Sequence, residues 1–287
     1  MLVHQGRFSI EAMCRVLRVS RSGFYDFKAC PQNQRIKRDR ELKVTIQSVF
    51  KENEERYGSP RIHLELRDQG VRCSQKRVAR LMRELGLVAT KARRFVATTD
   101  SDHGFPVASN LLNREFDVDA IADVNQKWAG DITYVPTAQG WLYLAVVLDL
   151  KSRKVIGWSM KDRIDKSLVQ EALTMATKRR LGGPIKGKLL FHSDRGSQYA
   201  STSYREQLEQ HGIVCSMSRK GNCWDNAPLE SFFATLKKEL IHRQKYQNHN
   251  QAKASLFYYI EAFYNRKRRH SALGYISPHE YEHNSLI

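Results

Sequence analysis

The chain has 287 residues, enough for two domains or for one large domain with a smaller appendage. Its 48 Lys and Arg residues outnumber its 30 Asp and Glu residues, so the formal net charge at pH 7 is +18. Hydrophobic residues make up 41% of the chain, an ordinary share for a protein with a packed core, and no apolar run reaches the roughly 18 residues of a membrane span. We therefore expect no membrane protein.

The cysteines and histidines argue against zinc and disulfides. The five cysteines are widely spaced without a Cys-x-x-Cys pair, a pattern typical of reduced thiols in a cytosolic protein. The histidines form no HxxxH or HExxH motif, so we expect no zinc site. The first residues, MLVHQGRFSIEAM, lack the apolar core of a signal peptide, and the expected location is the cytoplasm.

The positive charge is uneven along the chain. Residues 1–100 contain 22 Lys and Arg against 11 Asp and Glu. Such an excess favours a polyanionic partner, and nucleic acid is the commonest one. The alternatives are a solvated basic surface or attraction to anionic lipid, but the chain has neither an amphipathic anchor nor a lipidation motif.

Residues 1–88 are predicted to form a helical DNA-binding region that contains helix-turn-helix elements. Apolar residues from Ile10 to Leu17 recur at helical spacing, and Ser9 is a plausible N-cap. A short second helix could begin at Ser20, which would give a pair of helix-turn-helix length.

A second helical pair follows a charged helix predicted over residues 33–56. Its first helix is SPRIHLELRDQG (59–70), and its second, SQKRVARLMRELG, begins after an N-cap at Ser74. Basic residues recur on one face of the second helix: Lys76, Arg80 and Arg83. An exposed basic face and a helix laid against DNA both fit this pattern, and the overall charge favours DNA contact.

Residues 89–126 lose periodicity and gain small and polar residues, which predicts a linker. From residue 127 the pattern changes to strands, with KWAGDITYVPT, WLYLAVVLDL and KVIGWSMKD as an antiparallel meander. Helices then alternate with two more strands. The order β-β-β-α-β-α-β predicts a mixed sheet flanked by helices, an α/β core over 127–245, and a C-terminal helix with a basic tail over 246–287.

Three carboxylates in this core could form one site. Asp131 lies in the first strand, and Asp194 ends the fourth strand, KLLFHSD, which could lie beside the first. Glu230 lies in the first turn of the helix LESFFATLKKELI. Two or three carboxylates can hold two divalent cations about 3.5–4 Å apart for phosphoryl transfer, and their hard oxygen ligands suit Mg²⁺ or Mn²⁺.

Each carboxylate also has a structural alternative. Asp194, followed by Gly196, could cap a turn, Asp131 could form a salt bridge, and Glu230 could merely favour a helix N-terminus. About one residue in ten of the chain is acidic, so spacing alone does not establish a site. The flanking residues decide between these alternatives.

The flanking motifs GDIT, HSDRGSQY and GNCWDNAPLESFFATLKKEL together resemble the catalytic core of the DDE transposases of bacterial insertion sequences. They are most similar to the OrfB product of the copy-out family related to retroviral integrases. The resemblance covers roughly residues 125–285, and YGSPRIHLELRDQG and RVARLMRELGL extend it toward the N-terminus. It implies a ribonuclease-H-like core of the retroviral integrase type, with an acidic, metal-holding triad of Asp131, Asp194 and Glu230.

The same resemblance implies a DNA transposase subunit. Such a protein binds the terminal inverted repeats of its element, hydrolyses one strand at the 3′ end with Mg²⁺, and joins the released 3′-hydroxyl to another phosphodiester. Joining two ends implies at least a dimer on DNA. Family members usually act as a fusion with an OrfA product, so such a partner is expected. Retroviral integrases carry an N-terminal zinc module that this chain lacks, so zinc is not carried over.

Further residues are expected to support the site or to hold DNA. Lys237 follows Glu230 by two helical turns on nearly the same face and resembles a DNA-contacting residue of the family; the alternative is a solvated lysine. Trp224 and Asn226 match the family motif beside the site, whereas Asp225 could cap a helix or act indirectly. A basic cluster near the C-terminus is expected to meet phosphates: Arg266, Lys267, Arg268, Arg269 and His270.

Three aromatic residues are expected in packing roles: Trp128, Tyr259 and Phe263. Two other functions remain open at this point. One is a metal-dependent nuclease or resolvase of the same fold, which cuts without joining. The other is a DNA-binding regulator whose core has lost activity, against which the intact triad argues.

Overall fold

The computed structural model describes residues 1–29, 34–89, 106–182, 188–219 and 223–285. The chain divides into two compact units, Met1–Thr90 and Lys91–Ile287. Among the helices within these ranges, none combines the length and the apolar character needed to cross a bilayer.

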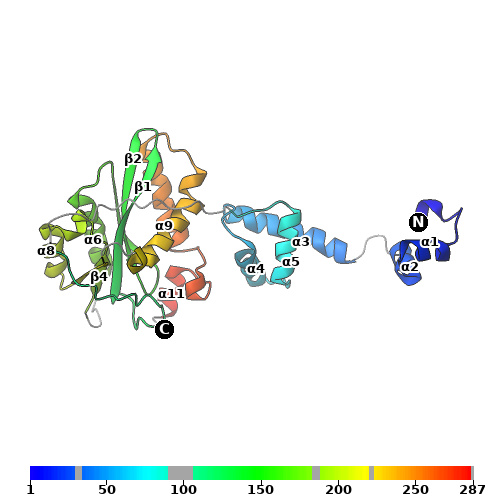
Figure 1. Ribbon diagram of the computed structural model, residues 1–287, viewed down its shortest axis with the longest axis horizontal. Coiled ribbons are helices and arrows are strands. Elements are labelled where there is room, and N and C mark those ends of the chain that lie inside the picture. Colours follow the sequence, from blue (N-terminus) through cyan, green and yellow to red (C-terminus); the bar gives the residue numbers. More distant parts are fainter. Residues whose placement is uncertain (30–33, 90–105, 183–187, 220–222, 286–287) are drawn as a thin grey trace. The chain divides into compact units, whose positions relative to one another are not determined.

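The first unit is helical (Figure 1). Its elements are the 3-10 helix η1 (Leu2–His4), α1 (Ile10–Leu17), α2 (Arg21–Ala29), α3 (Gln34–Glu52), α4 (Ser59–Asp68) and α5 (Gln75–Glu84). Helices α3, α4 and α5 pack on one another around Ile46, Ile62 and Leu81, each fully buried.

Local signals place the ends of these helices. The backbone N–H of Ala12 donates to the Ser9 side chain over 3.2 Å, which confirms the predicted N-cap, and Ser74 caps α5 in the same way. Gly70 and Gly86 adopt φ values of 79° and 67° just after α4 and α5. This left-handed backbone, which costs glycine little, ends both helices where the sequence predicts.

The second unit is built on a five-stranded sheet in the order β3-β2-β1-β4-β5. The strands are β1 (Lys127–Thr137), β2 (Gly140–Asp149), β3 (Val155–Lys161), β4 (Leu190–Ser193) and β5 (Val214–Met217). The first three pair as an antiparallel meander, and β4 and β5 run parallel to β1. The predicted order of strands and helices is confirmed.

Helices lie around this sheet (Figure 1). They are α6 (Lys166–Arg180), α7 (Ser197–Ala200), α8 (Thr202–Gln210), α9 (Ala227–Glu239), α10 (His249–Phe257) and α11 (Pro278–Asn284). Of these, α6, α8, α9 and α10 contact its strands. Short 3-10 helices are η2 (Cys223–Asn226), η3 (Ile241–Arg243) and η5 (Ser271–Leu273), and α10 continues into the π-helical η4 (Tyr258–Tyr264). Trp128, Tyr259 and Phe263 are buried, as predicted for packing residues.

Helix α6 lies so close to β3 that Gly157 has no room for a side chain. A Cβ at this position would lie 2.2 Å from the carbonyl oxygen of Ala172 and 2.8 Å from the Cβ of Ala176. Gly157→Ala must therefore push the helix from the sheet, and we expect it to lower the free energy of unfolding by about 1–3 kcal/mol. Urea denaturation measures this loss.

The matched control for that variant is Gly182→Ala, because a Cβ at Gly182 would meet no atom within 4 Å. We expect its unfolding free energy to stay within about 0.5 kcal/mol of the wild type. Equal stability of the two variants would show that α6 can move away from β3 at little cost.

The predicted linker over 89–126 takes a different form in its second half. Residues 106–126 contain no helix or strand, as expected, but three of their side chains are buried: Leu112, Val118 and Ile121. The backbone N–H groups of Leu111 and Leu112 also donate to the hydroxyl of Ser216 in β5, over 2.9 and 3.2 Å. This part of the segment therefore packs into the second unit, whereas residues 90–105 lie outside the described residues.

The C-terminal segment also packs into the second unit. The Asn265 side chain bonds the backbone of Val155 in both directions, accepting from its N–H over 3.0 Å and donating to its carbonyl over 2.9 Å. Val155 belongs to β3, an edge strand of the sheet, and an edge strand needs such partners. Residues 246–285 therefore complete the folded core and do not form a separate tail.

Candidate active site

Asp131 and Asp194 lie side by side because β1 and β4 are parallel neighbours. The last pair in their register joins Gly130 to Ser193, so Asp131 is the next residue of β1 and Asp194 is the first residue after β4. Gly130 permits this close packing, because a Cβ there would lie 2.5 Å from the Phe191 ring. Both carboxylates line one cavity of about 480 Å³.

The pKa of Asp131 is strongly perturbed in this cavity. Its Oδ1 accepts a hydrogen bond from the backbone N–H of Ile132 over 2.7 Å. Burial raises the pKa of Asp131 well above its ordinary value, and the negative charges of Asp194 and Glu230 raise it further, while Lys237 acts in the opposite direction. Carboxylates that repel one another in this way form a site whose charge a divalent cation would neutralise.

Asp194 makes the turn contact that was one of the alternatives and also faces the cavity. Its Oδ1 accepts a hydrogen bond from the backbone N–H of Gly196 over 2.9 Å, which closes a turn before α7. Its carboxylate also lines the cavity beside Asp131. The turn therefore holds the side chain in one orientation toward the site.

Glu230 and Lys237 come to the same region on α9, which packs against β1. Burial raises the pKa of Glu230 and lowers that of Lys237. The Lys237 ammonium lies 4.7 Å from the centre of the Tyr134 ring, a cation–π distance, so it is not a simple solvated lysine. Within the described part of the chain, no three Asp, Glu, His or Cys side chains lie close enough to hold one ion together.

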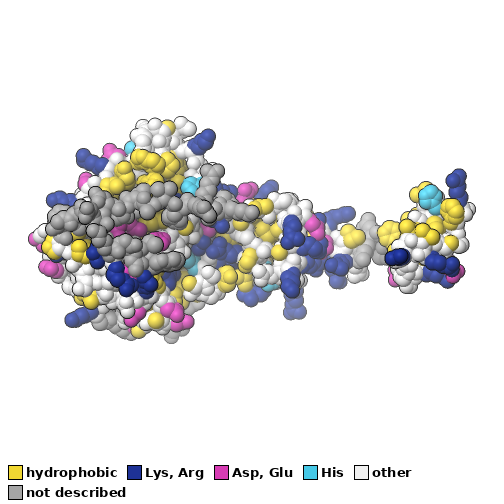
Figure 2. Space-filling model, in the orientation of Figure 1, with side chains coloured by type: hydrophobic (Ala, Val, Ile, Leu, Met, Phe, Trp, Pro, Cys, Tyr) yellow, Lys and Arg dark blue, Asp and Glu magenta, His cyan; other side chains and the backbone are white. Residues whose placement is uncertain are grey.

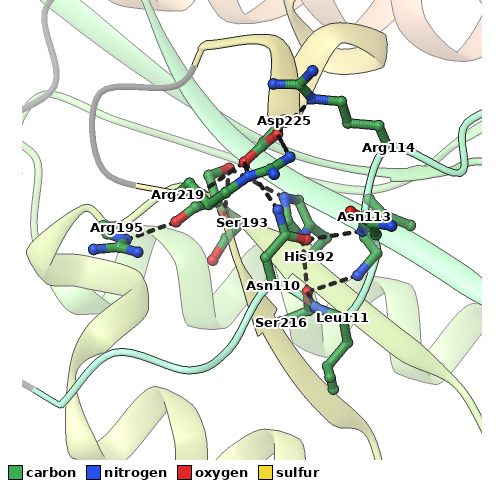
Figure 3. Close-up of polar contacts among 12 residues, drawn as sticks. Asn110, Leu111, Asn113, Arg114, His192, Ser193, Arg195, Ser216, Arg219 and Asp225 are labelled. Carbon is green, nitrogen blue, oxygen red and sulfur yellow. Dashed lines mark hydrogen bonds and ion pairs between the residues drawn. The ribbon is translucent and has the colours of Figure 1, made fainter.

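Asp225 is a functional candidate to which the sequence gave no definite role. Its carboxylate is fully buried and does not cap a helix. It accepts hydrogen bonds from the backbone and guanidinium of Arg219, from Arg114 Nε over 2.8 Å and from Asn110 Nδ2 over 2.9 Å (Figure 3). These cations hold its pKa well below the ordinary value. The only signal in the sequence was its position within the family motif.

The Asp225 cluster ties segments that are far apart in the sequence to the start of α9. The next residue, Asn226, occupies the N-cap position of α9 and is buried, but its side chain makes no capping bond. Nearby, His192 is fully buried between the hydroxyls of Ser216 and Ser218, and burial lowers its pKa to about 4. It is therefore a neutral core residue at pH 7. The Trp224 side chain lies outside the described residues.

Asp225→Asn is expected to slow the DNA strand cleavage that the sequence predicts by about 10–100-fold, which is the usual cost of losing a group that orients a catalytic ligand. The amide oxygen can still accept a hydrogen bond from one arginine, but a neutral side chain cannot neutralise the charges of Arg114 and Arg219. The first turn of α9, which carries Glu230, is then held less firmly. Single-turnover cleavage of labelled DNA would give the rate, and fluorescence anisotropy the affinity. A purely structural role would instead predict an unchanged rate for the folded fraction.

The predicted DNA-binding cations differ in what surrounds them. On α5, Lys76 and Arg83 are exposed, whereas the guanidinium of Arg80 donates to Asp39 over 2.7 Å and to Glu84 over 2.6 Å. Figure 2 shows Lys and Arg side chains standing out over the α3–α5 helices. Arg80 therefore helps to join α5 to α3, in addition to adding positive charge to this face.

The C-terminal basic cluster requires one correction. Arg266 is exposed, and Arg269 is partly buried and donates to the carbonyl of Tyr275 over 3.2 Å. Arg268, however, is only 6% exposed and bonds both carboxylate oxygens of Glu239, which is itself buried. The expectation that Arg268 meets phosphates is therefore wrong for this fold, because its charge is already paired inside the protein.

Known proteins match the chain over nearly all of its length. Residues 122–223 and 211–278 match two family models described as integrase core domain, and residues 37–95 match one described as HTH-like domain. The transposase InsF for insertion sequence IS3A of Escherichia coli is 46% identical over 287 residues, covering 99% of this chain and 97% of that protein.

Two further matches extend this comparison. An uncharacterized 31 kDa protein of the insertion element IS600 from Shigella sonnei is 45% identical over 266 residues, covering 93% of this chain and 96% of that protein. Among solved structures, the catalytic core of HTLV-2 integrase in complex with magnesium superposes with a TM-score of 0.41 at 19% identity. It covers 55% of this chain and 97% of that one.

Proposed function

This chain belongs to the family of insertion-sequence transposases represented by InsF, DNA-binding enzymes with an integrase core, and we propose that it acts on the terminal inverted repeats of its element. At each 3′ end it would hydrolyse one strand and then transfer the released 3′-hydroxyl to another phosphodiester. The observation that carries this proposal is the pair formed by Asp131, within β1, and Asp194, directly after the parallel strand β4, with Glu230 and Lys237 close by.

The residues of the site fit a hard divalent cation, Mg²⁺ or Mn²⁺. Carboxylate oxygens are the ligands such ions prefer, and a bound cation would relieve the mutual repulsion of Asp131 and Asp194. We propose that these two residues hold two ions and that Glu230 completes the set. When bound, the metal would activate the attacking oxygen and stabilise the leaving one. No protein nucleophile is then required.

The surrounding cations would bind the DNA. Lys237, beside the carboxylates, would hold the backbone near the scissile phosphate, and Asn226 and Trp224 would support the loop next to it. Farther away, the exposed cations Lys76, Arg83 and Arg266 would add affinity with little sequence preference, and the partly buried Arg80 and Arg269 would add to the positive potential around them. Their charge would lower the affinity as salt is raised.

The assembly would contain more than one chain. Joining two DNA ends brings two sites together, so we propose at least a dimer on DNA, and an OrfA-type partner or fusion that supplies further DNA-binding and pairing segments. We propose that the reaction takes place in the bacterial cytoplasm, at the nucleoid.

The test is to incubate the purified chain with labelled terminal-repeat DNA and Mg²⁺, beside an Asp194→Ala variant. Strand cleavage and joined products from the wild type alone would support the proposal. Cleavage without joining would instead indicate a nuclease or resolvase of the same fold. The third outcome is that the chain binds the DNA but neither cleaves nor joins it. If its fusion to an OrfA product then behaves in the same way, the chain is a DNA-binding regulator.

A further inference from the structure

The cavity that holds the two aspartates has a second wall of a different chemistry. Opposed to the charge of Asp131 and Asp194, aromatic and aliphatic side chains make up much of its lining: Tyr134, Trp141, Tyr143, Ile164 and Tyr199. Among the described residues that line it there is no Lys or Arg. A wall of this kind does not bind phosphates, which proteins recognise with cations and N–H donors.

Two residues of this wall are unusually exposed for their type. Trp141 is 49% exposed and Ile164 is 45% exposed. Trp141 lies near the β1–β2 turn, opposite Pro136, and its ring meets Tyr134 edge to face, with centroids 4.9 Å apart and planes at 84°. Tyr134 in turn carries the Lys237 ammonium near its ring. The indole is therefore held in a defined orientation while much of its surface remains available.

The size of the cavity limits what can occupy it. A volume of about 480 Å³ suits a small ligand or a single nucleotide, and a DNA duplex cannot enter it. A phosphodiester that reaches the aspartates therefore brings its neighbouring base toward the aromatic wall only if that base has left the helix. Aromatic side chains bind such bases by stacking, with little dependence on base identity.

We propose that Trp141, supported by Tyr134 and Ile164, stacks on an unpaired nucleobase next to the scissile phosphate at the end of the element. This inference rests on the proposed function, because it assigns a further part of the same substrate. Trp141 is then a substrate-contacting residue that opens or traps the DNA end and positions the phosphate over the carboxylates.

The first test locates the base without relying on activity. Three DNA ends are prepared, each with 5-iodouracil at a different one of the last three positions. Each is bound to the wild-type chain and irradiated, and the cross-linked peptide is identified by mass spectrometry. We expect one position to cross-link to Trp141. Cross-links confined to other residues of the chain would overturn the inference.

The second test measures cleavage by Trp141→Ala and Trp141→Phe on fully paired ends and on ends whose last base pairs are mismatched. We expect the alanine variant to be about tenfold slower on paired ends and to recover partly on mismatched ends, because loss of one stacked base costs about this much. The phenylalanine variant should retain most of the wild-type rate. Equal rates for wild type and Trp141→Ala on paired ends would contradict the proposal.

The matched control is Tyr258→Ala, since Tyr258 is 50% exposed but does not line the cavity; its rate should equal the wild type. The tests also separate this inference from the proposed function. If the wild-type chain cross-links through Trp141 but neither cleaves nor joins DNA, the base-binding role of Trp141 is supported and the proposed transposase reaction is contradicted. If Trp141→Ala cleaves DNA normally but no longer self-associates, the aromatic wall is a contact between copies of the chain, and the proposal that it binds a base is overturned.

Discussion

Asp131→Asn is expected to lower Mg²⁺-dependent strand cleavage by more than about a hundredfold while raising the melting temperature of the metal-free protein. Asparagine keeps an oxygen for the N–H of Ile132 but has no charge with which to hold a cation. Loss of a group that only orients a metal ligand typically lowers activity or metal affinity about 10–100-fold, and loss of the ligand itself should lower them more. Cleavage of labelled DNA measures the first effect, and thermal melting in EDTA measures the second.

The sign of the stability effect follows from the pKa of Asp131. Burial and the charge of Asp194 raise this pKa above 3.8, its ordinary value, so ionisation of Asp131 disfavours the folded state. The penalty begins as the pH rises through 3.8 and is complete above the folded-state pKa. Asparagine never ionises and avoids it.

Metal and a control variant complete this experiment. Mg²⁺ should raise the melting temperature of the wild type but barely change that of Asp131→Asn, because only the wild type has the full ligand set. Asp119→Asn alters an exposed carboxylate and should change neither property. A lower melting temperature for Asp131→Asn in EDTA would instead identify Asp131 as a structural salt-bridge partner.

Glu239→Ala is expected to lower the free energy of unfolding by about 3–5 kcal/mol, the cost of leaving a buried charge without its partner. Glu239 accepts from Nε and Nη2 of Arg268 over 2.9 Å each and from the Tyr259 hydroxyl over 2.8 Å. Both members of the ion pair are almost completely buried, so water cannot replace the lost carboxylate. Urea denaturation followed by circular dichroism measures the change.

Glu115→Ala is the matched control, because Glu115 is 62% exposed and pairs with Lys127 over 2.7 Å. Removing this exposed partner should cost less than about 1 kcal/mol. The same experiment tests the correction for Arg268. If Arg268→Ala left stability unchanged but weakened DNA binding, phosphate contact would be the better account of that residue.

Local signals in the sequence determined the elements of this protein. Helix caps act over three or four residues, so Ser9 and Ser74 marked the starts of their helices correctly. The alternation of strands and helices gave the order of the second unit, because short apolar runs and turn residues are also local features. From that order, the fourth strand could be expected beside the first, which brings Asp194 at the end of one next to Asp131 within the other.

Only the tertiary structure decided which charged residues are available to a ligand. Arg80 bonds an aspartate 41 positions earlier, and Arg268 bonds a glutamate 29 positions earlier. Asp225 is buried through an arginine 111 positions away, in a segment whose composition predicted a linker. Likewise, Trp141 reaches the site because β1 and β2 pair. Residue type and spacing specify what a side chain can do, but its burial and its partners depend on residues that only folding brings beside it.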